Sequence, residues 1–186
     1  MLGLSQYTYA EATWTQQSSD WIVSHIRMFE YFGGVATAFV PDNLKSAVTK
    51  ADRYAPDLNP AYYDMASHYS TAIIPARAYK PKDKAKAEGA VCLVQRWILA
   101  RLRKQTFVGL DELNLAINDL LVSLNNRTFK KKDGSSKSWF DEFEKHKLQT
   151  LPKLRYVYRT YKKAKVNIDY HIQLENHCYS VPYKYI

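Results

Sequence analysis

The sequence of 186 residues is poor in the residues that mark several classes of protein. It has only 2 cysteines, Cys92 and Cys178, and no CxxC pair, which excludes a disulfide scaffold and indicates a reduced, cytoplasmic setting. No apolar run approaches the ~18 residues that a membrane helix needs. The N-terminus has no basic leader before an apolar segment, so we expect no secretion. A hydrophobic content of 46%, with only 6 Gly and 7 Pro, excludes disorder for most of the chain and indicates a real core.

Basic residues outnumber acidic ones by 27 to 18, and the excess is unevenly distributed. Residues 1–43 carry one basic and four acidic groups, residues 44–108 carry twelve and five, and residues 109–186 carry fourteen and nine. An acidic start followed by a basic body favours a polyanion bound by the later two-thirds. A solvated basic surface without a partner has the same composition, so the charge leaves both interpretations open.

The first half of the chain alternates between strand and helix patterns. Short aromatic or β-branched runs predict strands, and apolar residues spaced three and four apart predict helices. The expected strands are residues 7–13, 38–40 and 71–75, and the expected helices begin at Ser19–Asp20, at Asn59–Pro60 and at about Lys82. The last of these runs to about Lys104, with an apolar stripe of Ala87, Val91, Val94, Ile98 and Leu102. This order predicts an α/β sandwich with a partly parallel sheet.

The second half predicts helices and then a small β module. Residues 111–125 and 138–147 have helical patterns and are joined by a basic turn. Residues 166–174 alternate between apolar and polar side chains, and residues 178–183 return after a short turn. This pattern predicts a β-hairpin.

Two carboxylates fall where an α/β fold presents its ligands. Asp42 follows the strand predicted at residues 38–40, and open α/β sheets bind ligands beyond the carboxyl ends of their strands. Glu88 lies early in the long helix, at the edge of its apolar stripe. The alternative is structural, because Pro-Asp-Asn is ordinary turn chemistry and Lys84 with Glu88 is an ordinary surface pair. Spacing alone leaves both interpretations open.

Several segments, in order, resemble the IstA-like transposases of bacterial insertion sequences. They are LGLSQYTYAEAT (2–13), PDNLKSAV (41–48), DLNPAYYDMASHY (57–69), KPKDKAKAEGAVCLVQRWILARLR (80–103) and KKAKVNIDYHIQLENHCYSVPY (162–183). The resemblance implies an integrase-type, ribonuclease-H-like core that lacks its first strand, then a helical linker and the start of a small β-barrel like that of phage Mu transposase. The implied boundaries are residues 1–104, 105–152 and 153–186.

The resemblance also implies a chemistry, which is Mg²⁺-dependent DNA cleavage and strand transfer at three acidic residues. Asp42 matches the second and Glu88 the third, and both would be metal ligands. Two Mg²⁺ ions ~4 Å apart can clamp the attacking and leaving oxygens, and Mg²⁺ prefers carboxylate and phosphate oxygens. The expected partners are DNA, an AAA+ ATPase helper of the IstB type and, in the full-length family, further copies of the transposase. The lysines that would contact DNA phosphates are Lys45, Lys80, Lys82, Lys84 and Lys86.

The sequence departs from this family in one informative way. The first acidic residue of such cores sits on a strand upstream of the segment that residues 2–13 match, and no such strand is visible here. Glu11 and Asp20 lie in the wrong elements to replace it. Two carboxylates hold a metal pair poorly, so we expect the chain alone neither to cleave nor to join DNA. The alternatives are a non-catalytic DNA-binding or interfering fragment and a decayed gene remnant. The barrel is also expected to be incomplete, because only two of about five strands are clear.

The remaining candidate residues favour structural roles. His171, His177 and Cys178 lack a fourth ligand at zinc spacing, which predicts an exposed turn region. His25 and His68 fall in amphipathic helices, at a core edge or a surface. Near the start of the last module, basic and aromatic residues interleave in a pattern that suits base stacking and phosphate binding but is also found in half-buried strands. These residues are Arg155, Tyr156, Tyr158, Arg159, Tyr161, Lys162 and Lys163.

Overall fold

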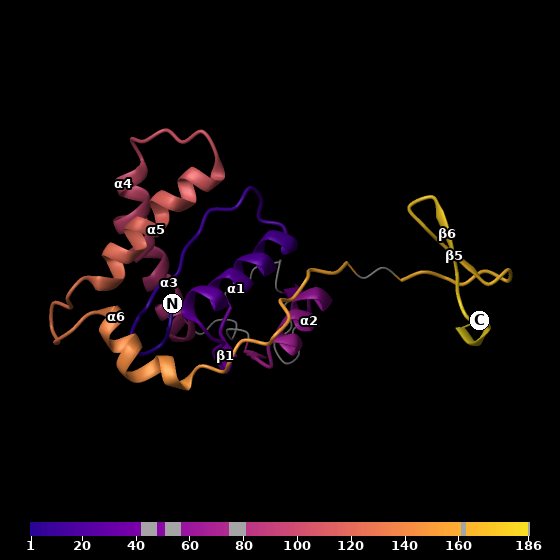
Figure 1. The fold of residues 1–186 in the computed structure, drawn as a ribbon, viewed down its shortest axis with the longest axis horizontal. Coiled ribbons are helices and arrows are strands. Elements are labelled where there is room, and N and C mark those ends of the chain that lie inside the picture. The colour runs from indigo at the N-terminus through magenta and orange to yellow at the C-terminus, as the bar shows by residue number, and fades with distance from the viewer. Residues whose placement is uncertain (42–47, 51–56, 75–80, 161–162, 186) are drawn as a thin grey trace.

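The computed structural model describes residues 1–41, 48–50, 57–74, 81–160 and 163–185. Helices and short strands alternate through the first half, followed by a helical segment and a hairpin (Figure 1). This mixture agrees with the predicted α/β class. In chain order, the elements are α1 (Ser18–Phe32), β1 (Ala38–Phe39), β2 (Val48–Lys50), β3 (Asp57–Leu58), α2 (Pro60–His68), β4 (Ala72–Ile73), α3 (Pro81–Val94), α4 (Ala100–Leu102), α5 (Leu110–Asn126), α6 (Ser136–Trp139), β5 (His171–Leu174) and β6 (His177–Ser180).

Helix α1 supplies one wall of the first core. Its apolar residues recur at helical spacing, so Ile22, Ile26 and Phe29 are buried on one face. The helix ends where the sequence predicts, because Gly33 adopts a left-handed φ of 70° and its N–H donates to the carbonyl of Glu30 at 3.1 Å.

Strands β1 and β4 form a parallel pair, with α2 in the connection between them. Ala38 pairs with Ala72 and Phe39 with Ile73. Asn59 caps α2, since its side chain accepts a hydrogen bond from the N–H of Ala61 at 3.0 Å. The buried face of α2 packs with that of α1, which gives a core that holds the two strands in place. This core comprises Ile22, Ile26, Phe29, Val35, Ala61, Tyr62, Met65, Tyr69 and Tyr156.

The long helix predicted from about Lys82 is present but interrupted. A π-helical turn, Gln95–Leu99, separates α3 from α4. Beyond this turn the helix packs against α5, and the two helices share a second core of Ile98, Leu102, Ile117, Leu121 and Leu124. The predicted apolar stripe is only partly buried, because Val91 is 56% exposed. Burial therefore concentrates in the C-terminal half of the helix.

Residues 7–13, predicted as a strand, are extended but belong to no strand in the described structure. Two amide side chains of α5 form hydrogen bonds with the backbone of residues 7–13 instead. Asn125 accepts from the N–H of Thr8 at 3.0 Å and donates to its carbonyl at 2.8 Å. Asn114 does the same at Ala12, at 2.7 and 3.1 Å. These bonds satisfy backbone groups that a neighbouring strand would otherwise satisfy.

The chain after α5 packs against the N-terminal residues. It belongs to the body of the structure, by which we mean the described residues up to 160. Ser135 begins α6 with a capping box, in which its hydroxyl accepts from the N–H of Ser138 at 3.1 Å. Glu144 then accepts hydrogen bonds from the N–H groups of Leu4 and Ser5 at 2.9 and 3.1 Å, and from the Ser5 hydroxyl. Tyr7 stacks on Phe140 with ring centroids 4.5 Å apart. The segment implied as a linker is thus in contact with the first residues, while the three domain boundaries stay predictions.

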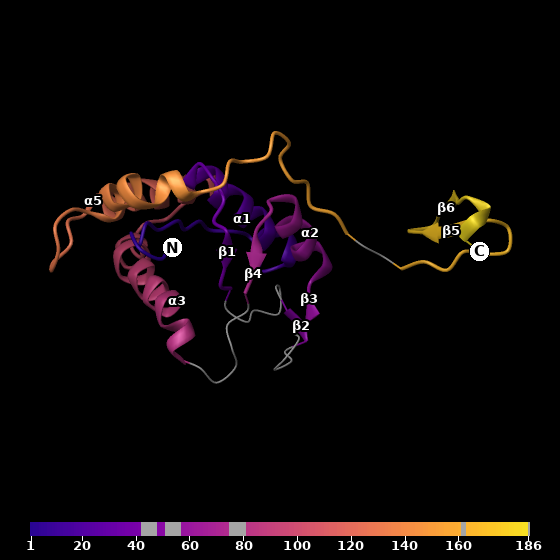
Figure 2. The same ribbon diagram turned by 90° about the horizontal axis from the view of Figure 1, so that it is seen from below.

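The predicted C-terminal hairpin is present as β5 and β6, paired antiparallel from His171 with Ser180 to Leu174 with His177. It stands apart from the rest of the structure in both views (Figures 1 and 2). Within the described residues it is a two-stranded ribbon and not a closed barrel. No helix of the described residues is long and apolar enough to cross a bilayer.

Candidate active site

The carboxyl edge of the β1–β4 pair is the place where the sequence predicts catalytic chemistry. The N–H of Ile74 donates to the carbonyl of Phe39 at 2.8 Å, so the two strands stay paired up to this edge. Pro41, the second residue after β1, is buried and precedes Asp42 in the sequence. Asp42, Lys45 and Lys80 lie outside the described residues, so their assignment to the site stays a prediction.

Helix α3 carries the second predicted carboxylate. Glu88 is exposed and makes no hydrogen bond or ion pair with a side chain that the structure describes. Lys82, Lys84 and Lys86 lie in the first turns of α3, where only the backbone is described, and the helical rise from Lys82 to Glu88 is about 9 Å. Figure 2 shows the start of α3 on the same side of the body as the ends of β1 and β4. This arrangement leaves the carboxylate of Glu88 open to solvent.

The residues that the structure describes contain no group of three or more His, Cys, Asp and Glu residues that could hold a metal ion. The chemistry of the predicted pair nevertheless suits Mg²⁺, which takes hard oxygen ligands and keeps several waters. Glu88 offers a carboxylate without a competing cation among the described side chains. Its donor chemistry therefore fits a divalent ion.

Two other acidic residues near the N-terminus are engaged elsewhere. Glu11 accepts a hydrogen bond from the Tyr9 hydroxyl at 2.7 Å and pairs with Arg27 at 3.2 Å. Asp20 accepts from the N–H of Thr15 at 3.0 Å, just before α1. Both carboxylates thus make structural contacts with neighbouring side chains or backbone.

The histidines have structural surroundings. His25 packs against the rings of Trp21 and Tyr62, with centroids 4.1 and 5.5 Å away, and burial lowers its pKa. The ring of His68 is exposed and contacts the carbonyl of Leu154 at 2.9 Å. Both findings confirm the predicted core-edge and surface positions.

The C-terminal candidates for metal binding also lie as predicted. His177 and Cys178 are exposed on β6, and His171 contacts Asp169 next to it in sequence, with 3.5 Å between Nδ1 and a carboxylate oxygen. Both cysteines of the chain are free and exposed. The hairpin therefore presents these residues on a surface.

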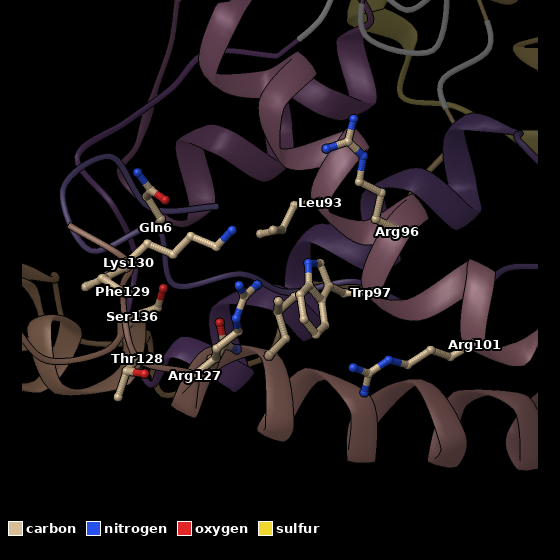
Figure 3. A pocket seen from close by; sticks show the side chains of 12 residues that line it. Gln6, Leu93, Arg96, Trp97, Arg101, Arg127, Thr128, Phe129, Lys130 and Ser136 are labelled. Carbon is tan, nitrogen blue, oxygen red and sulfur yellow. The ribbon is translucent and has the colours of Figure 1, made fainter. Parts of the chain in front are cut away.

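The sequence analysis missed a basic pocket beside the C-terminal half of the long helix. The cavity has a volume of about 660 Å³ and lies between the long helix, the end of α5 and Gln6 (Figure 3). Trp97 is at its centre, and four cationic side chains line it: Arg96, Arg101, Arg127 and Lys130. Trp97 and Arg101 are four residues apart in the sequence, but Arg127 lies directly after α5. Only the fold brings these residues together.

Comparison with known proteins identifies the relatives of this chain, although no family model matches it. It is 49% identical over 181 residues to a protein from Pseudomonas fluorescens named as a transposase for insertion sequence IS1162. It is 46% identical over 183 residues to one from Burkholderia multivorans named as a transposase for insertion sequence IS408. The chain belongs to the insertion-sequence transposases.

The alignments cover 97% and 98% of this chain but only 32% and 35% of those two transposases. The chain therefore spans about a third of the length of these relatives. The transposase for insertion sequence element IS21 from Pseudomonas aeruginosa is a more distant relative, with 24% identity over 181 residues. This set of relatives confirms the resemblance on which the sequence analysis relied.

Solved structures support the fold. The catalytic core domain of BIV integrase has a TM-score of 0.56 to this chain at 14% identity, covering 77% of this chain and 84% of that domain. A structure of the simian T-cell lymphotropic virus intasome, in complex with the PP2A regulatory subunit B56 gamma, also has a TM-score of 0.56, at 13% identity, covering 88% of this chain and 51% of that chain. The fold of this transposase chain is thus of the integrase catalytic-core type, as predicted.

Proposed function

We propose that this chain provides part of the catalytic core of an IstA-type transposase, for DNA transposition through Mg²⁺-dependent strand cleavage and transfer. Asp42 and Glu88 would be two of its three metal-binding carboxylates. The observation that carries the proposal is the parallel β1–β4 pair, in which β1 ends three residues before Asp42, in a chain related to transposases. Open α/β sheets bind their ligands at this edge.

The proposed roles follow from charge and position. The carboxylates of Asp42 and Glu88 would hold Mg²⁺, which when bound activates water and stabilises the charge of the reacting phosphate. The lysines proposed beside them would neutralise neighbouring phosphates and orient the DNA without reading its sequence. A separate ATPase helper of the IstB type and further transposase copies belong to the same proposal. The lysines are Lys45, Lys80, Lys82, Lys84 and Lys86.

The 186 residues alone are proposed to be catalytically inactive. Only two carboxylates are assigned to the site, and the local contacts of Glu11 and Asp20 support their exclusion. A second candidate function is DNA binding without catalysis, for example as a fragment that interferes with complete transposase. The basic pocket favours it, because its cationic residues have no acidic neighbour among the residues that line the cavity.

Two assays on the purified chain separate these functions. With a labelled transposon-end duplex and Mg²⁺, we expect no cleaved or joined product, and a product that disappears in Asp42→Ala would overturn the proposed inactivity. DNA binding is expected to weaken steeply between 50 and 200 mM salt and to change less than twofold in Asp42→Ala. Absence of a salt dependence would argue against both functions and in favour of a decayed remnant.

The metal role of Glu88 has its own test. Added Mn²⁺ should broaden the backbone amide resonances around Glu88, and Glu88→Gln should abolish this broadening. Asp119→Asn, which removes an exposed carboxylate of α5, is the matched control and should leave the broadening unchanged. Equal broadening in wild type and Glu88→Gln would remove Glu88 from the proposed site.

A further inference from the structure

The basic pocket holds two guanidinium groups in place by stacking. The Cζ of Arg127 lies 4.0 Å from the ring centroid of Trp97, and that of Arg101 lies 4.7 Å from it. Figure 3 shows the two groups on either side of the indole. Stacking on an aromatic face restrains a guanidinium while leaving its in-plane N–H groups free to donate. Each such fork suits the oxygens of one phosphate.

The surroundings of these two groups add positive charge without compensation. Lys130 extends its ammonium group toward the guanidinium of Arg127, whereas the guanidinium of Arg96 points away from both (Figure 3). The twelve residues that line the cavity include no Asp and no Glu. Thr128 and Ser136 add hydroxyl groups that can donate to an anion. A cavity with four cations, two hydroxyls and no carboxylate is complementary to an anion.

The positive surface continues past the cavity along the loop after α5. The Nζ of Lys132 lies 4.0 Å from the ring centroid of Phe129 and 3.4 Å from that of Trp139. Phe129 also lines the cavity. A restrained cation next to the cavity extends the positive region in one direction, which suits a chain of phosphates better than a single small anion.

We propose that this pocket binds the phosphodiester backbone of duplex DNA, at a site separate from the predicted carboxylates. The inference rests on the proposed DNA-binding function and deepens it by naming Arg101, Arg127 and Lys130 as the contacts. Arg101 follows Glu88 by thirteen residues on the long helix, a rise of about 20 Å, which corresponds to about six phosphates of one strand. The pocket would therefore engage DNA about six nucleotides away from the phosphate at the predicted site.

The test measures the affinity of the full 186-residue chain for a fluorescein-labelled 20-base-pair duplex by anisotropy, across 50–200 mM NaCl. The double variant Arg127→Gln/Lys130→Gln should bind on the order of tenfold or more weakly. The slope of log K against log salt should become shallower by about 1.8, which corresponds to two lost phosphate contacts. Circular dichroism checks that each variant is folded.

The control variant removes the same charge elsewhere. Lys147→Gln/Lys153→Gln changes two exposed lysines outside the pocket and should alter affinity less than twofold, with an unchanged slope. If the control and the pocket variant weaken binding equally, the pocket inference is overturned while DNA binding stands. If wild-type chain shows no salt-dependent binding to the duplex, the proposed DNA-binding function fails, and the inference fails with it.

Two further measurements identify the ligand and the role of stacking. Inorganic phosphate at 5 mM, at constant ionic strength, should not displace the duplex, and displacement would identify the pocket as a small-anion site instead. Arg127→Lys keeps the charge but loses the planar fork, so it should weaken binding while leaving the salt slope unchanged. Wild-type affinity in Arg127→Lys would overturn the proposed stacked, two-pronged contact.

Discussion

Two segments of this chain share a β pattern and reach different structures. Residues 7–13 and residues 171–174 both alternate in side-chain character, yet only the second segment forms a strand. A two-residue turn at Glu175–Asn176 brings β6 alongside β5, so the backbone groups of β5 find a ladder. Residues 7–13 have no neighbouring strand in the described structure, and Asn114 and Asn125 take its place. Alternation predicts an extended backbone, but the available partner decides whether it becomes a strand.

The two segments also differ in what keeps them ordered. Tyr7 and Thr8 are 7% and 1% exposed, whereas every residue of β6 is exposed. The first segment therefore depends on the packing of the body. The hairpin depends on its own turn and ladder, and a two-stranded hairpin is only marginally stable by itself. Substitutions should consequently act on one region without acting on the other.

The largest expected effect comes from removing hydrogen bonds between α5 and residues 7–13. We call the bonds that Asn114 and Asn125 make to this segment the clamp. Asn125→Ala leaves the N–H and carbonyl of Thr8 without their hydrogen-bond partner. It also removes the 3.1 Å hydrogen bond that the Asn125 amide donates to the Tyr31 hydroxyl. Because buried polar groups without partners cost ~1–3 kcal/mol each, we expect the free energy of unfolding to fall by about 3 kcal/mol. Urea unfolding followed by tryptophan fluorescence measures this in the body alone, since all 4 tryptophans precede residue 140.

The neighbouring residue supplies a matched control for that substitution. Asn126 is exposed, and within the part of the chain that the structure describes its amide donates only to the carbonyl of Val122, at 2.9 Å. Asn126→Ala should change the free energy of unfolding by less than about 0.5 kcal/mol. A loss in Asn125→Ala no larger than that in Asn126→Ala would show that the clamp does not stabilise residues 7–13.

Lowering the pH should destabilise the body through His25, with an effect on the free energy of unfolding smaller than that of Asn125→Ala. Burial lowers the pKa of His25 in the folded body, so the unfolded chain binds a proton first as the pH falls. The stability contributed by neutral His25 is complete above its unfolded pKa of ~6.5 and declines below it, by at most about 1.4 kcal/mol per pH unit. Urea midpoints at pH 7.5, 6.5 and 5.5 measure the decline.

Two histidine variants locate the origin of this pH dependence. His25→Gln should flatten the midpoints between pH 5.5 and 7.5, because it removes the group whose pKa is lowered. His68→Gln should keep the wild-type dependence, since His68 is exposed at the surface of α2. Identical pH profiles in wild type and His25→Gln would contradict the assignment to His25.

Local signals in the sequence predicted most of the helices. Gly33 ends α1, Asn59 caps α2, and helical periodicity places α5 within one residue of its predicted ends. Such features depend on neighbours in the chain, so one sequence suffices to find them. The cap of α1 is an exception, because Gln17 occupies the N-cap position, ahead of the predicted Ser19. The exposure of Val91 was also missed, because it depends on which elements cover the helix.

The candidate site likewise has parts that local sequence signals predict and parts that depend on tertiary packing. Asp42 and Glu88 come from their positions in predicted elements and from resemblance, and their assignment to the site stays a prediction. The basic pocket was missed because Trp97 and Arg127 are separated by 30 positions and meet only through the packing of the long helix against α5. No local pattern in the sequence contains that contact.

The smallest expected effect is a gain in the hairpin. Glu175 and Asn176 have φ values of 51° and 66°, the left-handed region that a tight antiparallel turn requires. Asn tolerates this region better than Glu does, so Glu175→Asn should stabilise the hairpin by about 0.5 kcal/mol. Hydrogen exchange of the amides in residues 171–180 measures the gain, which should appear as about twofold slower exchange. The urea midpoint from tryptophan fluorescence should stay unchanged, because the turn lies outside the body. A shift in that midpoint would mean that hairpin and body unfold as one unit. Residues 7–13 and 171–174 would then differ only in how their backbones are paired, and not in which part of the structure stabilises them.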